Sequence, residues 1–100
     1  MRIVAYRHLR EYGQRHSSAV RPLEFWYDTV RASTWRSMQD VRHSFSKAKV
    51  LNGERVRFEV SGGDFRLIAA FDFKSQIAYV KFIGTHAEYD AIDALTVSMF

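Results

Sequence analysis

Residues 54–73 constrain the fold most strongly, because every second side chain is apolar on both sides of a glycine pair. This period of two is typical of β-strands with one buried face, and Ser-Gly-Gly-Asp at 61–64 is a strong turn signal. The stretch therefore predicts a β-hairpin with Val60 opposite Phe65, Phe58 opposite Leu67 and one continuous apolar face.

The rest of the chain supplies helices to cover that face. Spacing and turn residues predict a short strand at 3–6, helices at 7–16 and 23–32, a helical turn at 38–43, a strand at 77–83 and a helix after Gly84. The layout predicts an α+β fold. Two N-terminal helices pack on one face of a mainly antiparallel sheet, and a short C-terminal helix follows. Residues 1–100 are expected to form a single domain.

The other face of the predicted sheet is rich in positive charge. Charged faces are ordinary in antiparallel sheets, and Arg66 would pair with Glu59 across the hairpin. Cations beside an aromatic ring also suit RNA, because they bind phosphates and stack against bases. Both interpretations stay open from the pattern alone. The residues predicted on this face are Arg55, Arg57, Arg66, Tyr79 and Lys81.

The length of the second turn decides which side chains of the last strand face the core. A two-residue turn at 74–75 or 75–76 puts Lys81 on the face of Arg66 and sends Val80 and Phe82 to the core. A turn of three residues would reverse these sides. We expect the two-residue turn.

The segment FIGTHAEYD at 82–90 combines a structural motif with reactive side chains. Thr85 and Glu88 are spaced as a capping box, which would start a helix. His86 then takes the first helical position with Tyr89 three residues later, and Asp90 can orient the histidine ring. Apolar residues at 91, 92 and 95 are expected to bury one side of this helix.

These side chains match what RNA cleavage by a neighbouring 2′-hydroxyl requires, namely a base, an acid and cations for the extra negative charge. His86 and Tyr89 are the candidate proton-transfer groups, and Arg66 and Lys81 are the candidate cations. Spacing alone is weak support, since a lone histidine at a helix start is more often structural.

Composition restricts the remaining possibilities. The net charge of +4 and pI of about 9.7 favour a nucleic acid or an acidic protein as partner. The absence of cysteine excludes disulfides and thiolate metal sites and fits the cytoplasm. The four histidines at positions 8, 16, 43 and 86 lack ligand spacing, so no metal and no cofactor is expected. No window is long and apolar enough to span a membrane.

Three stretches resemble the HigB toxins, a family of mRNA interferases with the RelE-like fold. They are DVRHSF at 40–45, DFRLIAAFDF at 64–73 and IAYVKFIGTHAEYD at 77–90. The resemblance implies a type II toxin–antitoxin toxin that inhibits translation as a metal-independent endoribonuclease, cutting mRNA on the ribosome. It implies catalytic roles for Arg66, Lys81, His86 and Tyr89.

The resemblance also implies partners. These are a HigA-type helix-turn-helix antitoxin, mRNA and the ribosome, with operator DNA bound only through the antitoxin complex. Two alternatives compete with an endoribonuclease: a non-catalytic RNA- or DNA-binding module whose sheet face only holds phosphate, and an interaction protein whose basic N-terminal helices bind an acidic partner.

Overall fold

The computed structural model describes all of residues 1–100 and contains one five-stranded sheet with the strand order β1-β5-β4-β3-β2. β1 runs parallel to β5 and the other neighbours are antiparallel, so the predicted α+β architecture is confirmed. The strands are β1 (Arg2–Val4), β2 (Lys49–Val50), β3 (Arg55–Val60), β4 (Phe65–Asp72) and β5 (Ile77–Thr85). The helices are α1 (Tyr6–Arg15), α2 (Val20–Ala32), α3 (Met38–Ser44) and α4 (His86–Asp90).

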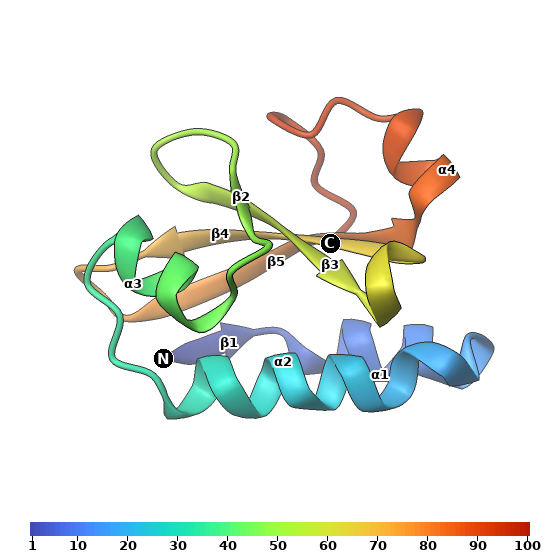
Figure 1. Ribbon diagram of the computed structural model, residues 1–100, viewed down its shortest axis with the longest axis horizontal. Coiled ribbons are helices and arrows are strands. Elements are labelled where there is room, and N and C mark those ends of the chain that lie inside the picture. The colour runs from blue at the N-terminus through green and yellow to red at the C-terminus, as the bar shows by residue number, and fades with distance from the viewer.

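The main core lies between the sheet and the two N-terminal helices. Figure 1 shows α1 and α2 along one side of the sheet and α4 on the other. We call the face of the sheet that α1 and α2 cover the first face. Leu9 and Trp26 are buried against its strand residues, and the Trp26 ring meets Phe58 edge to face at 5.5 Å between centroids. The face that α1 and α2 leave uncovered is called the second face below.

The β3–β4 hairpin has the predicted register, with Val60 opposite Phe65 and Phe58 opposite Leu67. Its turn is a short 3₁₀ segment in which Gly62 and Gly63 have φ angles of 67° and 98°. Glycine takes such positive φ values at little cost, which explains the Gly-Gly pair. The turn thereby sets which side chains of β3 and β4 share a face.

The β4–β5 pair starts in the predicted register and then changes. Asp72 is opposite Ile77 and Ala69 is opposite Val80, but a β-bulge follows, so Ile68 is opposite Phe82. The extra residue at the bulge interrupts the alternation of sides. The prediction that Phe82 joins the first face is therefore wrong: it is buried, but on the second face beside Ile68.

The C-terminal segment 91–100 also differs from expectation. α4 ends at Asp90, and Leu95 is 51% exposed, so the predicted burial of one helical side through 95 is wrong. The segment instead turns back at 93–97 and continues over the second face, where the Met99 amide donates to the Lys81 carbonyl at 2.9 Å. Phe100 ends stacked on His8 of α1, with 3.8 Å between ring centroids. The second face is consequently not fully open to solvent.

Candidate active site

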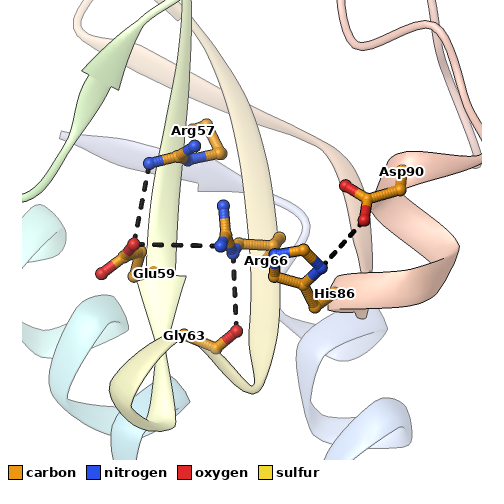
Figure 2. A network of polar contacts seen from close by, with 6 residues as sticks. All are labelled: Arg57, Glu59, Gly63, Arg66, His86 and Asp90. Carbon is orange, nitrogen blue, oxygen red and sulfur yellow. Dashed lines mark hydrogen bonds and ion pairs between the residues drawn. The ribbon is translucent and has the colours of Figure 1, made fainter.

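Two arginines of the second face share one carboxylate. Arg57 and Glu59 alternate along β3, and Glu59 lies opposite Arg66 of β4. The Glu59 Oε1 atom is 3.8 Å from Arg57 Nη2 and 3.9 Å from Arg66 Nη2 (Figure 2). These side chains are only 16%, 26% and 11% exposed for Arg57, Glu59 and Arg66. The cluster therefore holds an excess of positive charge in a half-buried setting.

The guanidinium groups of Arg57 and Arg66 do not have all their hydrogen-bond donors satisfied. Arg57 Nε is buried and has no hydrogen-bond partner, and Arg66 Nε reaches the Gly63 carbonyl at 3.5 Å, the long limit of a hydrogen bond. Buried guanidinium groups normally have their donors satisfied. The Nη2 atoms of Arg57 and Arg66 reach Glu59 only at 3.8 and 3.9 Å, beyond hydrogen-bond distance, so their donors suit an anion with several oxygens, such as a phosphate.

Tyr89 of α4 lies beside both arginines. Its ring centroid is 6.0 Å from the Arg57 guanidinium carbon and 5.6 Å from that of Arg66. The close approach of α4 depends on Gly84, where an added Cβ would come within 2.7 Å of Phe82 and 3.2 Å of Glu88. Gly84 therefore lets α4 start directly against β5.

The start of α4 is a complete capping box, as predicted. Thr85 Oγ1 accepts the Glu88 amide at 3.1 Å, and Glu88 Oε1 accepts the Thr85 amide at 2.8 Å. The bond from the Thr85 amide is the main reason why the pKa of Glu88 is lowered. The His86 amide also donates to the Asp64 carbonyl at 3.1 Å, which ties the helix start to the beginning of β4.

His86 meets its predicted partner. The Nδ1 atom is 3.0 Å from Asp90 Oδ2, as Figure 2 shows, and the His86 side chain is 55% exposed. A carboxylate at Nδ1 favours the tautomer that carries its proton there and leaves the Nε2 lone pair free. His86 can therefore accept a proton from a group in solvent.

Lys81 and Tyr79 form a separate pair on β5. The Lys81 ammonium nitrogen is 5.6 Å from the centroid of the Tyr79 ring. Lys81 lies at the bulge, three positions before Gly84, the residue that is opposite Arg66. The structure thus groups Arg57 and Arg66 with Tyr89, and Lys81 with Tyr79.

Arg55 has a different environment from the exposed one expected. It is 8% exposed, and its Nη1 donates to the carbonyls of Ala94 at 3.2 Å and Val97 at 2.7 Å. The segment 91–100 occupies Nη1 and covers most of the Arg55 side chain, so little of this guanidinium is accessible to a phosphate in this conformation. The sequence did not indicate this because the contact joins residues about forty positions apart.

Two residues near Glu88 were not among the predicted site residues. The Tyr12 and His16 rings stack at 4.1 Å, and Tyr12 and His16 meet Phe65 edge to face at 5.7 and 5.5 Å. Burial raises the pKa of Tyr12, and the Glu88 carboxylate raises it further. The spacing of four between Tyr12 and His16 could have indicated that His16 shares the inward side of α1.

No group of three His, Cys, Asp or Glu side chains is placed to hold a metal ion together. None of the helices combines the length and apolar character that a membrane crossing requires.

Comparison with known families matches residues 19–92 to the HigB toxins, described as the RelE-like toxic component of a toxin-antitoxin system. The match spans most of the chain and includes every residue of the arginine cluster and α4. The chain belongs to the HigB toxin family. It is therefore a toxin whose family implies an antitoxin partner. No curated protein matches the chain in sequence.

Proposed function

We propose that this HigB-family chain is an endoribonuclease that cuts mRNA by attack of a 2′-hydroxyl on the adjacent phosphate. One observation carries the proposal: two half-buried arginines, Arg57 and Arg66, share a single carboxylate oxygen at 3.8 and 3.9 Å beside the Tyr89 ring. A phosphate would complete the hydrogen bonds that these guanidinium groups lack. The same groups would stabilise the additional charge of the transition state.

The proton transfers are assigned to α4. The 2′-oxygen bonds to phosphorus while the bond from phosphorus to the 5′-oxygen breaks, which gives a 2′,3′-cyclic phosphate and a 5′-hydroxyl. His86 Nε2 takes the 2′-proton, since Asp90 occupies Nδ1. Tyr89 supplies the proton of the leaving oxygen. Residues three apart on a helix have Cβ atoms roughly 5–6 Å apart, which fits groups on two sides of one phosphate.

The remaining residues of the predicted site have supporting roles in the proposal. Lys81 and Tyr79 would contact RNA further along β5, while Thr85 and Glu88 hold the start of α4. The substrate is mRNA on the ribosome in the cytoplasm, no metal takes part, and a HigA-type antitoxin blocks the toxin. Operator DNA would be bound only by the complex with that antitoxin.

The decisive experiment is cleavage of mRNA on purified ribosomes, with analysis of the new ends. Arg66→Ala should slow cleavage by about 10²–10³-fold, the usual effect of removing one donor to a developing oxyanion. Arg21→Ala is the matched control, because Arg21 is exposed on α2 and far from the cluster in the sequence. His86→Ala should have a similar effect and change the pH dependence of the rate.

Two outcomes would contradict the proposal. Cleavage at the wild-type rate by both Arg66→Ala and His86→Ala would refute the site. RNA binding that weakens with salt but yields no cyclic phosphate ends, on ribosomes or on free RNA, would instead favour a non-catalytic binding module.

A further inference from the structure

A cavity adjoins the arginine cluster on the side of β3 that faces α3. β2 pairs with β3 only at Val56 and Arg57, so the outer edge of β3 beyond Arg57 is left without a neighbouring strand. Residues 44–48, at the end of α3 and directly after it, line an open cavity of about 310 Å³ together with residues of β3. That volume is at the lower end of the roughly 300–1,000 Å³ usual for small-molecule sites.

The walls of the cavity combine aromatic carbon with a few polar groups. Phe45 and Phe58 both line it, and their rings meet edge to face at 5.2 Å, which fixes Phe45 in place. Ser44, Ser46 and Lys47 provide polar groups at the same site. Ser44 Oγ accepts the Trp35 indole N–H at 3.3 Å, so its own hydroxyl proton stays available to a ligand. A flat, partly polar ring system fits this combination.

Glu59 connects the cavity to the arginine cluster. It lines the cavity, yet both ion pairs to Arg57 and Arg66 use its Oε1 atom. Its second carboxylate oxygen points away from the two arginines in Figure 2. A carboxylate oxygen accepts hydrogen bonds and donates none, so this atom would favour a ligand that presents an N–H group.

We infer that the cavity binds the nucleobase next to the phosphate held by Arg57 and Arg66, and that Glu59 favours bases with an exocyclic amino group. Adenine, cytosine and guanine carry such a group. Uracil has no exocyclic amino group, and the two carbonyl oxygens beside its ring N3–H would be repelled by the carboxylate. The inference rests on the proposed function, because it takes the ligand of the arginine cluster to be an RNA phosphate. It adds a base-selecting site that the arginines alone do not supply.

The test uses the full chain and short RNAs that cannot be cut, namely 2′-O-methyl dinucleotides of each base. Amide shifts in NMR titrations should appear at 44–48 and Gly62 as well as near Arg66. Binding should be roughly tenfold or more tighter for adenine, cytosine or guanine than for uracil. Ser46→Trp fills the cavity from an exposed position and should remove this preference, while binding of a dinucleotide without bases should stay unchanged.

Ser75→Trp is the control, since it places the same side chain on an exposed turn between β4 and β5. Circular dichroism verifies that both variants fold. Equal affinity for uracil and the other bases, or shifts confined to the arginine cluster, would overturn the inference. So would unchanged base preference in Ser46→Trp, even if the protein cuts RNA. Base binding in the cavity without any cleavage would overturn only the proposed catalytic function.

Discussion

Arg55 holds the C-terminal segment against the second face, and its replacement by methionine should release that segment. Methionine has a similar length but no charge and no donor, so it leaves no unpaired cation behind. The change removes two bonds from a guanidinium to the carbonyls of Ala94 and Val97, at 3.2 and 2.7 Å. The other hydrogen bond between this segment and the sheet is the one from the Met99 amide to the Lys81 carbonyl.

The magnitude follows from the number of bonds lost. A hydrogen bond to a charged group contributes roughly 1.5–3 kcal/mol, but the two carbonyls regain water once the segment lifts, which offsets part of the loss. A net change of about 2 kcal/mol in the opening free energy of the segment corresponds to a roughly 30-fold larger open population. The Met99 amide should therefore exchange its hydrogen roughly 30-fold faster in Arg55→Met.

Hydrogen exchange followed by NMR measures this directly, because the Met99 amide exchanges only when its bond to Lys81 opens. Core amides of β4, such as that of Leu67, report the stability of the whole fold in the same experiment. Arg21→Met on α2 is a control for the loss of one positive charge. If Met99 exchanges at the same rate in Arg55→Met as in the wild type, the two bonds do not hold the segment and the reasoning fails.

Three further predictions concern β5 and α4. Lys81→Ala should slow RNA cleavage far less than Arg66→Ala, by less than about tenfold, because its ammonium lies over a tyrosine ring; an equal loss in initial rates would contradict this. Glu88→Gln should be less stable than the wild type at neutral pH, since the Thr85 amide lowers the pKa of the Glu88 carboxyl and stabilises its charged form. That stability is complete above the unfolded pKa and is lost as pH falls through the lowered folded pKa. In urea unfolding, the difference in free energy of unfolding between the wild type and Glu88→Gln should therefore shrink below pH 4.5. Gly84→Ala should lower the free energy of unfolding by about 1–3 kcal/mol, because the new Cβ would lie 2.7 Å from the Phe82 ring; an unchanged urea midpoint would refute the close contact.

The parts of the fold that local patterns determine could be predicted. The Gly-Gly turn and the apolar alternation set the β3–β4 register, and the Thr85 and Glu88 spacing gave the start of α4. The bulge in β5 could not be predicted, because IAYVKFIG is apolar enough to present either side to a core. Phe82 was consequently assigned to the wrong face.

The sequence predicted which side chains lie on the second face better than it predicted which of them contact one another. Alternation placed Arg57 and Arg66 on one face with Glu59 between them, and the structure adds Tyr89 beside both. The enclosure of Arg55 was not predictable, because it depends on a segment without periodicity that returns across the sheet. Long-range contacts of this kind leave no local signal in a sequence.

The bulge at Lys81 also limits how the length of this chain can vary during evolution. If the same chain paired without the bulge, the register that starts at Asp72 and Ile77 would continue and bring Gly84 opposite Phe65 instead of Arg66. The start of α4 would then be displaced by one residue relative to β4. Homologous chains should therefore accept insertions in the turn at 73–76, whereas a residue added between Val80 and His86 would move the start of α4 along β4, whatever side chain it carries.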